Sequence, residues 1–495
     1  MGVDLAYAFI ATFGTLRARM LAASCSQPIW SLAMPDADPI KHVIVLMLEN
    51  RSFDHMLGGL SSAIAGLDGA AKDGEPDRIN KADGKSYKQI AGASRTIKYD
   101  PKHELQHALN QLSKANSGFV ADFAVAYPYS QPADRAEIMK YFADGTLPAL
   151  HALAKNFAVC DKWFSSLPGP TWPNRFFVHS GTSIGRASMP EGIFDANLHW
   201  YDQTTLYDRL NEKQIDWRIY YGDIPQSLIL VHQLEPENAR HYVKLTKFFR
   251  DAGGDAKDFP QYCFIEPPYY QPGAADDHPP HDVFEGERLI ADVYNAILRN
   301  DQLWKSSLLV VLYDEHGGFY DHVVPPPAVP PDHHVEEYKF DQLGVRVPAI
   351  LVSPFVKPGV IHTVFDHTSL LKYLVDKWGL GPLGARVAAA NSFANVLLPA
   401  PQDAARLPVI QAPTPAGSAN PKFGQIESRV QPTLNAHQAA LAGMTQVLES
   451  MTEVPGEAVL GRTKRIVTGF DGVVDVAAER LEQFLAQQRS AVPSQ

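Results

Sequence analysis

The stretch HVIVLML at residues 42–48 runs directly into ENRSFDH at residues 49–55. A second stretch, LLVVLY at 308–313, runs in the same way into DEHGGFYDH at 314–322. Both begin as apolar runs without polar alternation, which is typical of strands buried on both faces of a sheet. Chemistry in parallel sheets gathers at the carboxyl ends of the strands, so the two polar groups can meet there if the strands are neighbours.

Strand and helix patterns alternate along the rest of this region. Further apolar runs rich in β-branched residues cover 215–221, 262–265 and 347–352. Between them lie helical patterns at 147–154, 283–298 and 368–378. Strands that alternate with helices predict an α/β fold built on a parallel sheet.

Composition divides the chain near residue 400. The length suits either about three domains or one large α/β domain with additions. We expect an N-terminal arm at 1–38, an α/β region at 39–400, a Pro-rich connector at 401–425 and a helical C-terminal region at 426–495. The last region carries two amphipathic helical patterns, at 434–451 and 473–485. We expect these helices to cover the sheet domain or to mediate association, rather than to form a separate catalytic unit.

The net charge excludes some partners. The 495 residues include 44 Lys and Arg against 55 Asp and Glu, which leaves a charge of −11. Such a chain is unsuited to coating nucleic acid or an anionic membrane by bulk charge, so we expect no nucleic-acid partner. An anionic substrate would need a local positive site, such as a metal ion. Hydrophobic residues make up 45% of the chain, enough for a packed core.

Cysteine usage and the N-terminus say little about the compartment. Cys25, Cys160 and Cys263 show neither a disulfide framework nor metal-ligand spacing. No apolar run reaches the ~20 residues of a membrane span. The apolar run at 5–13 has no basic residue before it, which favours an N-terminal helix over a secretory signal. A cytoplasmic location is slightly favoured, and export stays open.

Four oxygen-bearing side chains follow the two decisive strands. Glu49 and Asn50 follow the first strand, and Asp314 and Glu315 follow the second. Oxygen donors suit a hard divalent cation such as Ca²⁺, Mg²⁺ or Mn²⁺, whereas structural zinc prefers nitrogen and sulfur. The alternative for the first group is a polar loop with a purely structural role.

A threonine lies at the start of a predicted helix. In LPGPTWPNR at 167–175, Pro173 indicates a first helical turn and Thr171 precedes it. Helix N-termini favour anions, and metal coordination would activate the hydroxyl of Thr171 as a nucleophile. The alternative is an ordinary capping threonine.

Histidines occur in two further motifs. In DDHPPHD at 276–282, His278 and His281 can donate protons to a leaving group or bind a second metal, and the spacing does not decide between these roles. In HELQH at 103–107, His103, Glu104 and His107 match the H-E-x-x-H pattern of zinc proteases. A histidine at a helix N-terminus would equally suit a phosphate group.

Taken together, these motifs resemble the bacterial phospholipase C and acid phosphatase family, a phosphoesterase family whose plant relatives are the non-specific phospholipases C. The resemblance runs from about residue 40 to 375 and does not cover the C-terminal helices. The matching stretches are 41–58, 100–103, 147–183, 278–290, 309–326, 348–359 and 366–374.

The resemblance implies an alkaline-phosphatase-like three-layer sandwich with a mainly parallel central sheet, and it makes 39–400 the catalytic domain. It also implies a set of site residues. One divalent metal ion would be bound by Glu49, Asn50, Thr171, Asp314 and Glu315. Catalysis would involve Thr171, His278, His103 and, less directly matched, His281; substrate binding would involve His103 and Asn174. His107 is not part of the family pattern, which disfavours the zinc protease interpretation.

The function implied is metal-dependent hydrolysis of phosphate esters through a phosphothreonine. We expect a phospholipase C that releases diacylglycerol and a phosphorylated head group, with transient contact to a membrane surface. The alternatives are an acid phosphatase acting on small phosphomonoesters, and a non-catalytic lipid- or phosphate-binding protein. The oligomeric state stays open. Five aromatic residues could line a lipid site, although packing is the favoured interpretation for them: Tyr127, Tyr129, Trp172, Tyr269 and Tyr270.

Overall fold

The computed structural model describes residues 38–72, 74–190, 201–270, 273–402, 407–413, 434–452 and 470–492. Within it, Ala37–Gln495 forms one compact unit. The predicted N-terminal arm and its helix at 5–13 lie outside the described residues, as does much of the predicted connector. The domain boundaries near residues 400 and 425 therefore stay predictions.

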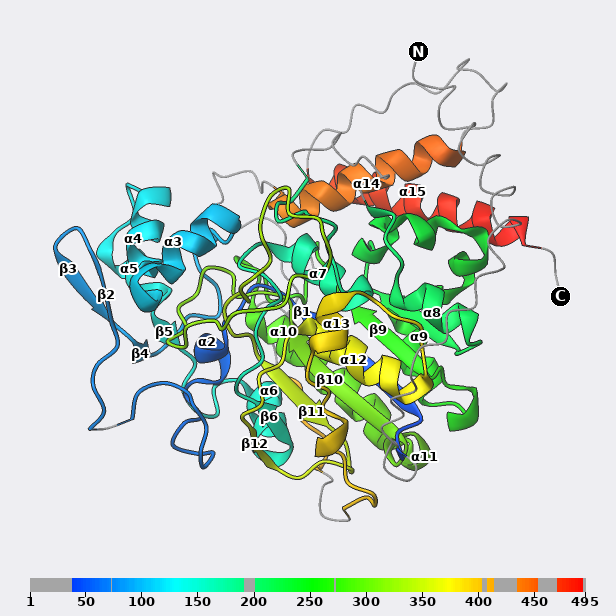
Figure 1. Cartoon of the computed structure of the whole chain (residues 1–495), viewed down its shortest axis with the longest axis horizontal. Helices are drawn as coiled ribbons and strands as arrows, with labels where there is room; N and C mark the ends of the chain where they lie inside the picture. The colour runs from blue at the N-terminus through cyan, green and yellow to red at the C-terminus, as the bar shows by residue number, and fades with distance from the viewer. Residues whose placement is uncertain are drawn as a thin grey trace, which may run out of the picture. The chain divides into compact units, whose positions relative to one another are not determined.

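An eight-stranded sheet forms the centre of the fold, in the order β12-β6-β11-β10-β1-β9-β7-β8 (Figure 1). β11 is antiparallel to both of its neighbours, and every other pairing is parallel. The mainly parallel sheet is thus confirmed. The strands are β1 (His42–Leu48), β6 (Ala158–Cys160), β7 (Trp217–Tyr221), β8 (Tyr242–Lys244), β9 (Tyr262–Glu266), β10 (Ser307–Tyr313), β11 (Ala349–Val352) and β12 (Gly359–Ile361).

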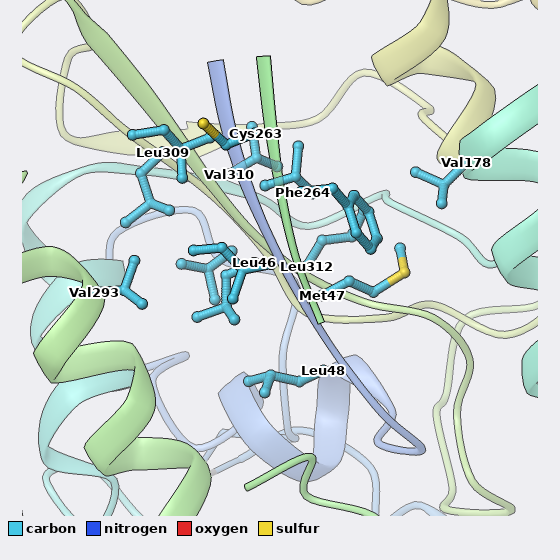
Figure 2. Packing of buried hydrophobic residues seen from close by; sticks show 14 of the residues in the cluster. Leu46, Met47, Leu48, Val178, Cys263, Phe264, Val293, Leu309, Val310 and Leu312 are labelled. Carbon is cyan, nitrogen blue, oxygen red and sulfur yellow. The ribbon is translucent and has the colours of Figure 1, made fainter. Parts of the chain in front are cut away.

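Helices cover both faces of this sheet. On one face α10 (Val283–Arg299) packs with α6 (Pro148–Asn156) and α11 (Asp301–Trp304), and on the other α7 (Thr171–Ser180) packs with α12 (His367–Trp378). Figure 2 shows Val293 of α10 and Val178 of α7 on opposite sides of the central strands. The three-layer architecture follows, because each strand must bury both of its faces.

The remaining helices of this layer system are short. They are α2 (Phe53–Leu57), α8 (Leu206–Glu212), α9 (Leu245–Ala252) and α13 (Ala385–Ala389), with 3-10 turns at Gln226–Ile229, Val231–Leu234, Pro236–His241, Ala256–Asp258 and Ala394–Val396. β6, β8 and β12 were not predicted, because three residues are too few to show a periodic pattern.

The register of β1 on β10 aligns the two decisive stretches. All seven residues of each strand are buried, and Leu48 pairs with Tyr313 at the carboxyl end. The chain therefore leaves both strands at the same level, with Glu49 and Asp314 as the first residue beyond each. The predicted neighbour relationship is confirmed.

A small subdomain with its own core is inserted between α2 and α6. It contains β2 (Ile79–Ala82), β3 (Lys85–Lys88), β4 (Ile90–Ala91), β5 (Lys140–Tyr141), α3 (Leu105–Asn116), α4 (Phe119–Ala126) and α5 (Pro132–Glu137). Its apolar cluster includes Phe119 and Phe123 together with Phe319, which follows β10. This shared cluster holds the segment around His103 against the carboxyl end of the sheet.

Two C-terminal helices complete the described chain: α14 (Ala436–Thr452) and α15 (Phe470–Ala491). Apolar side chains of both helices, such as Met444 and Phe484, belong to the same core cluster as the sheet. The two predicted helices are present, and α15 is longer than the pattern at 473–485 indicated. Among the described residues, no helix has the length and apolar character needed to cross a membrane.

Candidate active site

The four predicted oxygen donors lie together at the carboxyl end of β1 and β10. Glu49, Asn50, Asp314 and Glu315 each have 0% exposure. The backbone N–H of Asn50 donates to Asp314 Oδ1 over 3.1 Å, and the N–H of Asp314 donates to the carbonyl of Leu48 over 3.1 Å. The two polar groups, 264 residues apart in the chain, thus form one buried cluster.

Two glycines after β10 allow this close approach. Gly317 and Gly318 both have positive φ, at +61° and +73°. A Cβ on Gly317 would lie 2.1 Å from the carbonyl oxygen of Asn50, and one on Gly318 would lie 2.7 Å from that of Lys102. Only glycine fits such contacts, so the Gly-Gly pair joins the acidic cluster to the segment that carries His103.

Thr171 is the first residue of α7, with Pro170 as the N-cap. It is 1% exposed, and its Oγ1 donates to Oδ1 of Asn50 over 3.3 Å. The hydroxyl therefore lies both beside the acidic cluster and at the positive end of the helix dipole. The sequence had placed Thr171 just before the helix, and the structure moves it one position into the first turn.

The side chain of Asn174 holds the loop that precedes α7. Its Nδ2 donates to the carbonyls of Gly169 (2.9 Å) and Pro170 (3.2 Å), and its Oδ1 accepts from the N–H of Leu167 (3.2 Å). The amide is 0% exposed and its polar atoms are occupied by these loop contacts. The predicted role of Asn174 in substrate binding stays a prediction, and its observed contacts are those of a residue that positions Thr171.

Arg175 lies within the acidic cluster and was not among the site residues predicted from the sequence. Its Nη2 is 3.0 Å from Glu49 Oε1, its Nε donates to Asp314 Oδ2 over 3.2 Å, and its Nη1 donates to the hydroxyl of Tyr269 over 3.0 Å. Residues i and i+4 share one helix face, so Arg175 follows Thr171 on the same side of α7. The i, i+4 spacing from Thr171 is the sequence feature that could have identified Arg175 as a site residue.

The cluster contains three acids, Glu49, Asp314 and Glu315, and Arg175 forms ion pairs with the first two. Burial raises the pKa of Glu49 well above its ordinary value and that of Asp314 to about 7, while Arg175 opposes both shifts. Glu49 Oε1 is in an ion pair with Arg175, but among the described residues Glu49 Oε2 and Glu315 Oε1 have no hydrogen-bond partner. Buried carboxylates without partners are costly, and oxygen donors are what hard divalent cations prefer. The residues present therefore fit the expected metal ion.

Three histidines surround the cluster. His103 Nε2 lies 3.1 Å from Asn50 Nδ2 and 3.8 Å from Glu315 Oε1. The rings of His103 and His278 are 5.9 Å apart, and those of His278 and His281 are 6.3 Å apart. His281 Nδ1 is hydrogen-bonded to Asp276 Oδ1 at 2.6 Å. The three imidazoles thus converge on one side of the acids.

Their environments separate the three pKa values. Burial lowers the pKa of His278. Burial would do the same to His103, but the charges of Glu315, Asp100 and Glu104 raise its pKa to about 9. Asp276 likewise raises the pKa of His281 against the effect of burial. Such a divergence among neighbouring groups is typical of acid–base sites.

Comparison with known proteins decides the family. Residues 40–381 match the Phosphoesterase family. The chain is 36% identical over 393 residues to non-specific phospholipase C6 of Arabidopsis thaliana, covering 72% of each chain.

The chain belongs to the Phosphoesterase family. It is a hydrolase that acts on phosphate esters. Bacterial relatives include the hemolytic phospholipase C of Pseudomonas aeruginosa, 29% identical over 409 residues (69% of this chain, 53% of the relative). Phospholipase C B of Mycobacterium tuberculosis is 28% identical over 401 residues (69% and 74%). A solved structure in the alkaline phosphatase superfamily, from Vibrio parahaemolyticus, aligns with a TM-score of 0.29 at 12% identity over 48% of this chain and 61% of that one.

The H-E-x-x-H stretch of this phosphoesterase is not a zinc site. α3 begins at Leu105, so His103 and Glu104 lie before the helix and not in its first turns. His103 faces Asn50, whereas His107 Nδ1 is 3.0 Å from Asp122 Oδ1. The two imidazoles contact different residues and do not converge on one point, so the zinc protease interpretation is wrong.

A second group of candidate ligands lies elsewhere in the phosphoesterase, at Asp54, Asp321 and His322. Arg346 pairs with Asp54 (3.0 Å) and with Asp321 (2.9 Å), and His322 Nδ1 lies 2.8 Å from Asp54 Oδ2. Because cationic side chains already neutralise both acids, we interpret this group as a buried ion-pair network.

The five aromatic residues do not form one wall. Tyr129 is 90% exposed, while Trp172, Tyr269 and Tyr270 are buried. Tyr269 and Trp172 both contact His437 of α14. These three aromatics are therefore packed inside the protein and do not form an exposed lipid-binding wall, in agreement with the interpretation favoured above. His437 itself was missed, since it lies beyond the matched region and no local pattern marks it.

Proposed function

We propose that this phosphoesterase is a phospholipase C that cleaves glycerophospholipids to diacylglycerol and a phosphorylated head group. The observation that carries the proposal is the placement of Thr171, with its hydroxyl 3.3 Å from Asn50 Oδ1 at the N-terminus of α7. The phospholipase C names of plant and bacterial relatives support this substrate class.

Five residues would bind one hard divalent cation: Glu49, Asn50, Thr171, Asp314 and Glu315. When bound, this cation supplies the positive charge that an anionic phosphate requires and lowers the pKa of the coordinated hydroxyl. The backbone N–H groups at the N-terminus of α7 would also bind phosphate oxygens, because the helix dipole is positive at that end. Burial of all five side chains excludes water, which strengthens each of these interactions.

Thr171 Oγ1 attacks phosphorus in line with the departing alcohol and forms a phosphothreonine. Phosphoryl transfer depends mainly on such positioning and on electrostatic stabilisation. His103 binds a phosphate oxygen from the side of Glu315. Glu315, Asp100 and Glu104 raise the pKa of His103 to about 9, and its Nε2, which faces the amide nitrogen of Asn50 here, would take up a proton when the phosphate binds.

His278 accepts the proton that the Thr171 hydroxyl loses during the attack and gives it to the leaving alcohol. Its Nδ1 lies 2.6 Å from the carbonyl oxygen of Pro279, so Nδ1 carries a proton and Nε2 is free to exchange one with the substrate. The lowered pKa of His278 makes its protonated form a stronger acid. His281, held by Asp276, assists. Water then attacks the phosphothreonine; His278 accepts a proton from this water and returns one to the departing Thr171 oxygen.

Thr171 variants test this proposal. We expect Thr171→Ala to lose turnover of phosphatidylcholine vesicles while keeping its unfolding free energy within about 1 kcal/mol, because the hydroxyl makes one long hydrogen bond. Thr171→Ser keeps the hydroxyl and should retain part of the activity. Near-normal turnover in Thr171→Ala would overturn the assignment of the nucleophile.

The substrate class is tested by comparing phosphatidylcholine vesicles with a chromogenic phosphomonoester, each with and without chelator. We expect faster diester cleavage, release of diacylglycerol and loss of activity in chelator. Faster cleavage of the monoester would favour the acid phosphatase alternative. Absence of both activities in wild type with added Ca²⁺, Mg²⁺ or Mn²⁺ would favour a non-catalytic binding protein.

A further inference from the structure

His437, in the first turn of α14, contacts the candidate active site through Trp172 and Glu49. The first turn of α14 is capped reciprocally, with the N–H of Asn435 donating to Gln438 Oε1 (3.0 Å) and the N–H of Gln438 donating to Asn435 Oδ1 (2.8 Å). Gln438 Nε2 also donates to the carbonyl of Tyr269 (2.6 Å), and the hydroxyl of Tyr270 donates to the carbonyl of Gln438 (2.7 Å). These bonds fix the backbone of His437 against the segment that follows β9.

The contacts of the His437 ring determine its tautomer. An indole N–H can only donate, and Nε1 of Trp172 donates to His437 Nδ1 over 2.9 Å. A positively charged ring would carry a hydrogen on Nδ1 and could not accept this bond, so the ring is neutral. Its single proton therefore lies on Nε2. Tyr269 packs edge-on against the ring, with centroids 4.5 Å apart, and this limits its rotation.

The protonated nitrogen faces a proposed metal ligand. His437 Nε2 is 3.4 Å from Glu49 Oε1, and it has no hydrogen-bond partner among the described residues. A nitrogen that carries a proton cannot bind a metal ion through its lone pair. The ring is therefore arranged to donate to the carboxylate and not to join the ligand set.

We propose that His437 is a positioning residue whose Nε2–H orients the Glu49 carboxylate, so that α14 completes the metal site built at the carboxyl end of the sheet. The inference rests on the proposed function, because it assumes that Glu49 binds the metal. It extends that function to a helix beyond residues 40–381, the part that matches the family. Trp172, which sets the tautomer, directly follows Thr171, so one helical turn orders both the nucleophile and the ligand.

The test is a titration of metal-free full-length protein with Mn²⁺, followed by electron paramagnetic resonance or calorimetry. Loss of such an outer hydrogen bond typically weakens metal binding about 10- to 100-fold, and we expect this for His437→Leu. His437→Gln keeps an acceptor toward Trp172 and a donor toward Glu49, so it should recover most of the affinity. Trp172→Phe removes the donor that keeps the His437 proton on Nε2, so the Mn²⁺ affinity should fall by less than in His437→Leu.

The double variant Trp172→Phe/His437→Leu should bind Mn²⁺ no more weakly than His437→Leu alone, because Trp172 acts through His437. His241→Leu is a matched control, since His241 is also buried and stacks on a tryptophan, Trp217, outside the site. We expect it to lower stability and leave Mn²⁺ affinity unchanged.

Wild-type affinity in a folded His437→Leu would overturn this inference and leave the proposed metal site standing. If His437→Leu does not fold, wild-type affinity in Trp172→Phe overturns it, while a loss there with recovery in His437→Gln supports it. Absence of Mn²⁺ binding in wild type would instead overturn the metal-dependent function on which it rests.

Discussion

Arg175 Nη2 lies 3.0 Å from Oε1 of Glu49, and both side chains have 0% exposure. The same guanidinium is 3.2 Å from Asp314 Oδ2. A permanent cation thus compensates two proposed metal ligands from within the protein. Since a buried charge without a partner is expensive, this arrangement lets the acidic cluster fold before any metal arrives.

Replacing this cation tests that interpretation. Arg175→Met should destabilise the metal-free protein by about 3–5 kcal/mol, because two buried acids lose their partner. Added Mn²⁺ should restore part of the loss by supplying another cation. Urea unfolding with chelator and with Mn²⁺ measures both. Arg186→Met, which breaks a half-exposed pair with Glu337, should cost less than about 1 kcal/mol. An equally small effect at Arg175 would contradict the prediction.

Gly317→Ala should lower the turnover rate more than it lowers the stability of the fold. The new Cβ would lie 2.1 Å from the carbonyl oxygen of Asn50, at a φ of +61° that alanine adopts with strain. We expect a loss of about 1–3 kcal/mol and a larger loss of turnover, because Asn50 must move. Denaturation and vesicle assays measure the two effects. Gly253→Ala is the control, since its nearest atom would be 3.6 Å away and its φ is negative.

Asn174→Ala distinguishes positioning from substrate binding. Removing the amide releases the loop at 167–170 and shifts Thr171, so kcat should fall by about 100-fold with KM within about twofold. A raised KM with unchanged kcat would instead support the predicted substrate contact. Asn156→Ala, which loses one hydrogen bond to the carbonyl of Ala152, should change neither constant.

The ion-pair network at His322 predicts a pH dependence of stability. Burial opposes the charge on His322, but Asp54 and Asp68 raise its pKa from 6.5 to about 9, with Asp321 adding to the rise. Arg346, the cation that also faces the ring, repels its charge. Since the folded pKa exceeds the unfolded one, the stabilisation is complete below pH 6.5 and is lost as pH rises through 9.

That pKa difference corresponds to about 3 kcal/mol. Urea unfolding in chelator at pH 6, 7.5 and 9.5 should show the decline in wild type, and His322→Gln should remove most of it. If the unfolding free energies of wild type and His322→Gln fall in parallel with pH, a group other than His322 causes the decline.

Much of the sheet was predictable because its central strands have a clear sequence pattern. β1 and β10 are continuous apolar runs that break abruptly into polar residues, and their fully buried strands match the predicted bounds within one residue. The direction of β11 was not predictable, because an apolar run of four residues reads the same in either direction. Likewise, His103 was expected at a helix N-terminus, but the helix begins only at Leu105 because Glu104 serves as its N-cap.

By itself the sequence determined the α/β class, the acids after β1 and β10, and the threonine at a helix start, because each of these is a property of neighbouring residues. The tertiary structure alone decided which distant groups meet them. Arg175 reaches Glu49 only when α7 packs on the sheet, and His437 reaches it only when α14 docks on Tyr269. The physical reason is that a buried carboxylate selects its partners by distance in space, and local patterns do not encode that distance.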